Sequence, residues 1–149
     1  MIDAQTRFNA DKAYKDSKLC NLLMGLELSR RHPNIPVTCW SPGLVIPRSN
    51  DGFFRDSRRA NPLGQMLFGL LARDLLRVTE RPERAGELLT SLVLDTEKAG
   101  GFRYLSNSLN TPGQHSFGPG DLSEEAEDQV KAATLWSVSS DLITRCLSD

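Results

Sequence analysis

The feature that most constrains this fold is an amphipathic helical pattern that leads directly into an apolar strand. Between Ala10 and Arg31, five leucines recur at spacings near 3.6 residues, with charged side chains on the opposite side: Leu19, Leu22, Leu23, Leu26 and Leu28. Asn9 or Asp11 can cap this helix, and the His-Pro-Asn that follows it ends it. Residues 35–41 are strand formers that stop at a Ser-Pro-Gly turn. A helix that feeds an apolar strand is half of a βαβ unit, which predicts a parallel sheet covered by helices.

The rest of the chain predicts more helix than sheet. Residues 44–79 read as a lid region, a long loop with a short helix near 53–58 and then an apolar helix. A helix at 82–98 begins with a proline and ends before a Gly-Gly pair. A short strand at 102–107 and a Gly/Pro/Ser connector lead to a C-terminal helix at 123–147.

Two strands are too few for a stable open sheet, so we expect only part of a larger fold. No Gly-x-Gly-x-x-Gly or similar cluster follows a strand, and such a cluster normally cradles a dinucleotide pyrophosphate. The expected fold is therefore α/β and helix-rich: the C-terminal half of a Rossmann-like, doubly wound parallel sheet. It lacks the N-terminal glycine-rich nucleotide-binding unit, which points to a longer parent chain.

Composition excludes several other classes of protein. A net charge of -1 over 149 residues carries no basic footprint for nucleic acid. Three scattered cysteines and two distant histidines suggest neither a disulfide framework nor a metal site, and both histidines are expected on the surface or in loops. No apolar run is long enough to span a bilayer, and the first residues do not resemble a signal peptide.

The segment 64–77 is strongly apolar at helical spacing. We interpret it first as a core helix or a contact in a homo-oligomer, and second as a peripheral membrane contact.

Tyr14 and Lys18 are the candidate catalytic pair. Positions i and i+4 are neighbours on a helix, so the lysine ammonium is expected beside the phenol. A nearby ammonium favours the phenolate and lowers the tyrosine pKa, which eases proton donation near neutral pH. The remaining lysine donors suit the ribose hydroxyls of a cofactor. The spacing alone is a weak motif, because it arises easily by chance.

The context of this pair makes it more specific. A Tyr-x-x-x-Lys helix that leads to a strand ending in Pro-Gly resembles the short-chain dehydrogenase/reductases. The run KAYKDSKLCNLL, with ELSRRH after it and LSEEAEDQVKAATLW near the end, resembles light-dependent protochlorophyllide oxidoreductase. The resemblance is strongest over residues 9–32 and covers most of the chain more loosely, as a partial domain over 1–149.

This resemblance implies a reaction and a set of residues. The family reduces one double bond of protochlorophyllide with NADPH after the pigment absorbs a photon. Tyr14 matches the proposed proton donor, and Lys18 matches the residue that positions the cofactor. Pro42, Gly43, Leu44 and Val45 match the turn beside the nicotinamide, and Cys20 matches a cysteine near the pigment.

The turn also departs from the family pattern. The family typically reads Tyr-Pro-Gly-Cys-Ile-Ala there, whereas this chain has Ser41 before Pro-Gly and Leu44 in place of the second cysteine. A threonine expected near the nicotinamide amide has only Ser49 as a counterpart. The resemblance further implies a cytoplasmic or thylakoid-associated protein in a cyanobacterium, or a plastid protein in a eukaryote. Two alternatives remain open: another NADP(H)-dependent short-chain reductase, and a non-catalytic remnant or binding module.

Overall fold

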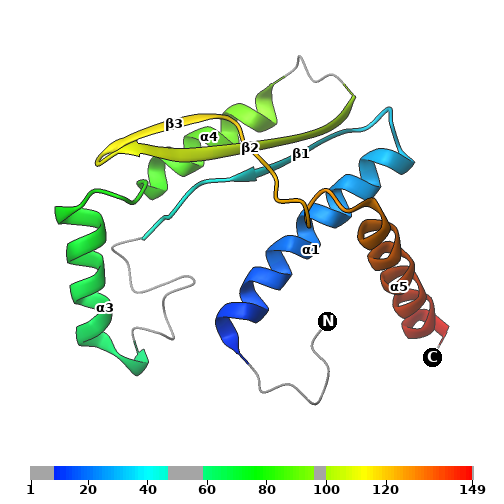
Figure 1. The fold of residues 1–149 in the computed structure, drawn as a ribbon, viewed down its shortest axis with the longest axis horizontal. Helices are drawn as coiled ribbons and strands as arrows, with labels where there is room; N and C mark the ends of the chain where they lie inside the picture. Colours follow the sequence, from blue (N-terminus) through cyan, green and yellow to red (C-terminus); the bar gives the residue numbers. More distant parts are fainter. Residues whose placement is uncertain (1–8, 47–58, 96–99, 149) are drawn as a thin grey trace. The chain divides into compact units, whose positions relative to one another are not determined.

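The computed structural model describes residues 9–46, 59–95 and 100–148 (Figure 1). Its helices are α1 (Ala10–Arg31), α3 (Pro62–Gly69), the π-helical segment η1 (Leu70–Leu75), α4 (Pro82–Leu94) and α5 (Gln129–Ser148). Its strands are β1 (Pro36–Ser41), β2 (Gly101–Thr111) and β3 (Gln114–Pro119), in the sheet order β1-β2-β3. The expected α/β, helix-rich class is confirmed. The short helix expected near 53–58 lies outside the described residues.

The sheet is mixed rather than purely parallel. β1 and β2 run in the same direction, as in a βαβ unit, whereas β2 and β3 pair antiparallel from Leu105↔Pro119 to Thr111↔Gln114 (Figure 1). The interpretation of residues 108–119 as a connector was therefore wrong. Pro112 presets one turn residue and Gly113 supplies the positive φ of 80° that the reversal needs. Backbone pairing along an edge strand tolerates the Ser, Gly and Pro residues that suggested a loop.

The described residues form two compact units. One takes its residues from Met1–Cys39, Ala99–Tyr104 and Asp121–Asp149, and the other from Trp40–Lys98 and Leu105–Gly120.

In the first unit, α1 packs on β1 at a glycine. A Cβ atom at Gly25 would lie 2.7 Å from Cys39 Sγ and 3.3 Å from the Phe102 ring, so only glycine fits this contact without displacing its neighbours. Burial raises the pKa of the Cys39 thiol, as expected for a cysteine that serves packing. Leu23 is also buried on α1, as the leucine pattern indicated, whereas Glu27 is buried too, although the charged residues were expected on the opposite, exposed side.

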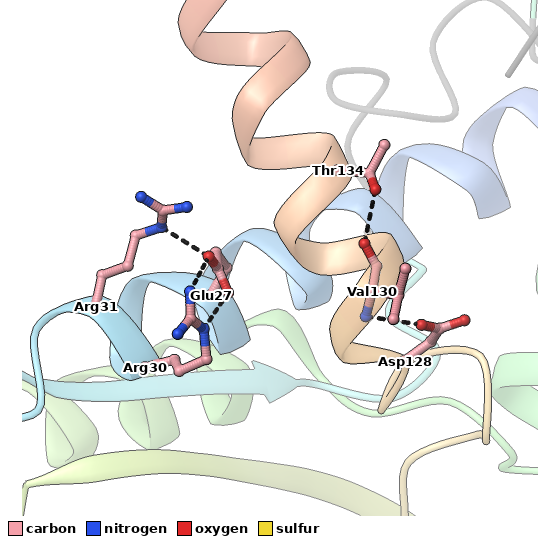
Figure 2. Close-up of polar contacts among 6 residues, drawn as sticks. All are labelled: Glu27, Arg30, Arg31, Asp128, Val130 and Thr134. Carbon is pink, nitrogen blue, oxygen red and sulfur yellow. Dashed lines mark hydrogen bonds and ion pairs between the residues drawn. The ribbon is translucent and has the colours of Figure 1, made fainter.

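A buried carboxylate organises the C-terminal end of α1 and its contact with α5 (Figure 2). The Glu27 side chain is 1% exposed and accepts hydrogen bonds from Arg30 and Arg31, each at 2.7 Å. Arg31 also lies over the Trp136 ring of α5, at 5.0 Å from its centroid. The hydrogen bonds from Arg30, together with those from Arg31, lower the pKa of Glu27 to about 2, although burial opposes this.

The C-terminal helix begins later than the sequence indicated. α5 starts at Gln129 because Asp128 Oδ1 accepts the N–H groups of Val130 and Lys131, both at 3.0 Å (Figure 2). Ser123, the expected start, instead closes a separate turn in which its carbonyl accepts the N–H of Ala126. The acidic residues Glu124, Glu125 and Glu127 therefore precede the helix.

In the second unit, the apolar segment α3–η1 is exposed rather than buried. Eight large apolar side chains on it are each more than 40% exposed: Leu63, Met66, Leu67, Phe68, Leu70, Leu71, Leu75 and Leu76. The core-helix interpretation of residues 64–77 is therefore wrong for the described chain, because Gly69 and Ala72 are the residues of this segment that face inward. Across the part of the chain that the structure describes, no helix has both the length and the apolar character of a membrane span.

Two further boundaries differ slightly from the sequence prediction. The strand expected at 35–41 begins at Pro36, and the helix expected at 82–98 ends at Leu94, with 96–99 outside the described residues. The lid region 44–79 contains the two helical segments α3 and η1.

Replacing Glu27 with glutamine tests the buried carboxylate. A carboxyl group with a lowered pKa in the folded state stabilises the fold above its ordinary pKa, here 4.5, and this stabilisation is lost as the pH falls toward 2. We expect Glu27→Gln to lower the free energy of unfolding at pH 7 and to reduce its fall between about pH 4.5 and 2. Urea unfolding across that range measures both effects.

The control is Glu87→Gln, which removes an ion pair to Arg84 whose side chains are 64% and 51% exposed. Exposed pairs contribute little, so this variant should follow the wild-type pH dependence. A Glu27→Gln curve that also parallels the wild type would contradict the role given to Glu27.

Candidate active site

Tyr14 and Lys18 lie one turn apart near the start of α1, on an exposed part of the helix. The Lys18 ammonium sits over the tyrosine ring, 5.2 Å from its centroid, and the Tyr14 side chain is 44% exposed. Asn9 caps this end of the helix by accepting the N–H of Lys12 at 3.0 Å. The helix therefore holds a phenol and an ammonium together where a ligand can reach both.

Lys18 differs from the two lysines before it on α1, because both of those form ion pairs. Lys12 pairs with Asp16 at 2.6 Å and Lys15 pairs with Asp11 at 2.7 Å, each across one helical turn. Lys18 makes no ion pair among the described residues. Its ammonium donors are thus available beside the tyrosine, while its neighbours on the same turns are bound to carboxylates.

Cys20 lies on the same helix, two residues beyond Lys18. Its thiol is free and its side chain is exposed. This exposure leaves the thiol accessible to a ligand.

The turn at Pro42–Val45 follows β1 in the second unit. Gly43 has a φ of +77°, and a Cβ atom there would lie 2.9 Å from the Asn107 carbonyl oxygen. The Leu44 carbonyl accepts the N–H of Glu80 at 2.8 Å, and Val45 forms a parallel bridge with the same residue. The turn is therefore closed on one side by β2 and by the segment before α4, while Gly43 and Leu44 remain exposed.

The side-chain amide of Asn107 holds this turn in place. Asn107 is 7% exposed, and its Nδ2 donates to the Pro42 carbonyl at 3.2 Å and to Glu80 Oε2 at 2.9 Å. Burial tends to raise the pKa of Glu80, but the N–H of Arg81, the Asn107 amide and nearby His115 lower it on balance. A buried amide and a buried carboxylate thus fix the turn to two other segments of the chain.

Sequence reasoning missed this cluster. Glu80 and Asn107 are 27 residues apart and were not singled out. His115 was expected on the surface or in a loop, which is wrong, since its side chain on β3 is 10% exposed and lies 3.8 Å from Glu80. The one available signal was an asparagine inside an otherwise strand-forming run. The other histidine, His32, is exposed at the end of α1, as expected.

The predicted site residues divide between the two compact units. Tyr14, Lys18 and Cys20 belong to the first unit, whereas the turn 42–45 belongs to the second. Ser49, the counterpart of the family threonine, lies outside the described residues.

Comparison with known proteins confirms the resemblance seen in the sequence. The chain is 35% identical over 146 residues to the chloroplastic protochlorophyllide reductase B of Hordeum vulgare, covering 96% of this chain and 34% of the relative. It is 34% identical over 148 residues to the chloroplastic protochlorophyllide reductase of Pisum sativum, with the same coverage of 96% and 34%. The chain therefore spans about a third of the length of these relatives. No protein-family model matches it.

Truncating Asn107 tests the cluster that holds the turn. Asn107→Ala removes the donor to a buried carboxylate and to a backbone carbonyl, so we expect a loss of about 1–3 kcal/mol in the free energy of unfolding. Asn110→Ala is the control on the same strand, because its hydrogen bond to Ser116 is exposed and its loss should cost less than about 0.5 kcal/mol. Equal effects of the two variants in urea unfolding would contradict the role of Asn107.

Proposed function

From its similarity to protochlorophyllide reductases, we propose that this chain carries the proton-donating part of an NADPH-dependent, light-driven protochlorophyllide reductase. The observation that carries the proposal is the Tyr14–Lys18 pair, exposed at the start of α1 with the ammonium over the phenol ring. The similarity over 96% of the chain supports it further. We propose the reaction, the use of NADPH and the binding of protochlorophyllide together.

NADPH, when bound, supplies the hydride for one carbon of the pigment double bond. Tyr14 donates the proton that the other carbon requires, from its phenolic hydroxyl. Lys18 holds its ammonium over the ring of that phenol, 5.2 Å from its centroid. The lysine donors also hydrogen-bond the ribose hydroxyls of the cofactor.

The turn Pro42–Val45 supplies the second contact with the cofactor in this proposal. Its exposed side at Gly43 and Leu44 suits the approach of a planar nicotinamide, and its other side is held by Asn107 and Glu80. Leu44, which replaces the second cysteine of the family, offers this ligand an apolar side chain that is 43% exposed. Cys20, exposed on the Tyr14 helix, is proposed to line the pigment site.

The pyrophosphate of NADPH requires a part that this sequence does not contain, because no glycine-rich cluster follows a strand. The relatives are about three times as long as this chain. We therefore propose that a longer parent chain or a partner polypeptide provides the nucleotide-binding part. A plastid or thylakoid-associated location follows from the proposed pigment. Contact with a membrane or with a second copy through α3–η1 stays a prediction.

Reconstitution tests the proposal. The full chain is mixed with the separately expressed nucleotide-binding part of the Hordeum vulgare relative, NADPH and protochlorophyllide, then illuminated and followed by absorbance. We expect reduction that falls roughly 100-fold or more in Tyr14→Phe, because a positioned proton donor contributes about that much. The control is Tyr104→Phe, which removes a hydroxyl from a half-buried tyrosine on β2 and should leave the rate unchanged.

Pigment and cofactor binding separate the alternatives. Binding of NADPH without protochlorophyllide would favour another short-chain reductase that uses the same pair. Binding of neither would favour the non-catalytic module and would overturn the proposal. Reduction that is equally fast in Tyr14→Phe would remove Tyr14 from the mechanism.

A further inference from the structure

The second compact unit contains a cavity of about 770 Å³ that the proposed reductase chemistry does not use. It lies where η1, the start of α4 and the β2–β3 turn meet. Its lining is dominated by charged side chains, among them Arg73, Arg77, Arg81 and Arg84, and all of its lining residues belong to this one unit.

Two of the three carboxylates that line this cavity are engaged with the protein itself. Asp74 accepts two hydrogen bonds from Arg73, at 3.1 and 2.8 Å. Glu80 accepts from Asn107 and from the N–H of Arg81, and is thereby tied to the turn after β1. Glu83, on the first turn of α4, is the third carboxylate. Within the described part of the chain, neither Asp74 nor Glu80 is therefore used in an ion pair with Arg77 or Arg81.

The arginines divide into paired and unpaired groups. Arg73 is bound to Asp74, and Arg84 donates to Glu87 at 2.9 Å. Arg77 and Arg81 make no ion pair among the described residues, although both line the cavity. Guanidinium groups have fixed, planar arrays of donors that match the oxygens of carboxylates and phosphates. Two unpaired guanidiniums beside one cavity are suited to such a ligand.

The backbone at Arg77 is held in an unfavourable conformation. Its φ is 49°, and among the described residues Arg77 is the one non-glycine residue with a positive φ. The N–H of Gly113 donates to the Arg77 carbonyl at 2.8 Å, which fixes this residue against the β2–β3 turn. A left-handed conformation is costly for a side chain such as arginine, and residues of this kind gather at ligand sites. The preceding segment η1 is π-helical, a feature that also recurs at functional sites.

We propose that this cavity binds an oxyanion, a phosphate or carboxylate group, between the guanidiniums of Arg77 and Arg81. Arg84 lines the cavity next to these two groups and adds positive charge to its wall, although it is shared with Glu87. The ligand is an organic phosphate or a carboxylic acid, both of which present the same oxygens to a guanidinium. The proposal does not depend on the reductase function, because neither arginine belongs to the Tyr14–Lys18 pair or to the turn 42–45.

Titration of the full chain with inorganic phosphate and with succinate tests the site, by calorimetry and by NMR of the arginine side chains. Chloride at matched ionic strength controls for general screening. We expect saturable binding of at least one of the two anions, with shifts at the Arg77 and Arg81 side-chain signals. Tighter binding of phosphate would identify an organic phosphate as the ligand class, and tighter binding of succinate a carboxylic acid.

The variants Arg81→Gln and Arg77→Gln/Arg81→Gln examine the guanidiniums directly. We expect affinity to fall roughly threefold or more in the first and tenfold or more in the second, since each removes charge-assisted hydrogen bonds. Arg145→Gln is the matched control, because Arg145 is exposed in the last turn of α5 and is not one of the residues that line the cavity. Arg81→Gln leaves the Arg77–Gly113 contact intact and so remains informative if the double variant is poorly folded.

Three results would overturn the proposal. These are no saturable binding of either anion, binding that both glutamine variants retain in full, and an equal loss in Arg145→Gln. Each of them can occur whether or not the chain supports pigment reduction, so the two proposals fail independently.

Discussion

The buried amide of Asn107 is the interaction on which the organisation of the second unit depends. It bridges the carbonyl of Pro42 and the carboxylate of Glu80, two groups far apart in the sequence. Because Glu80 also pairs with Val45 and accepts the N–H of Arg81, one side chain sets the turn after β1 and the start of α4 together. Burying an amide and a carboxylate is tolerated only because each satisfies the other. The hydrogen bond between Asn107 and Glu80 also positions Arg81, because the Arg81 N–H donates to the same carboxylate.

The functional side chains rely on a different kind of support. Tyr14 and Lys18 lie one turn apart on regular helix, with Asn9 capping the start of α1 and buried Glu27 fixing its far end through Arg30 and Arg31. The pair itself is exposed, as suits groups that meet a ligand. The turn 42–45 is instead fixed by buried polar contacts from distant segments. The two sets of residues belong to separate compact units.

Local patterns were readable from the sequence, and long-range polar contacts were not. The leucine spacing and the Asn9 cap located α1 at Ala10–Arg31, and β1 differs from its expected range by one residue. The start of α5 was misjudged because both Ser123 and Asp128 are good caps, and Asp128 is the one that closes the helix. β3 was missed because its Ser, Gly and Pro residues form a strand only by pairing with β2. The partners of Asn107 lie 65 and 27 residues away, where no local pattern reaches.

The central claim is that the Tyr14–Lys18 pair contacts the cofactor of the proposed reductase. Backbone hydrogen exchange, followed by mass spectrometry on the full chain with the nucleotide-binding part of a relative, tests it most directly. The account predicts that NADPH slows exchange in peptides that cover residues 12–20, and that Lys18→Met weakens this protection. Exchange over residues 12–20 that stays unchanged at saturating NADPH would contradict the role of the pair in holding the cofactor.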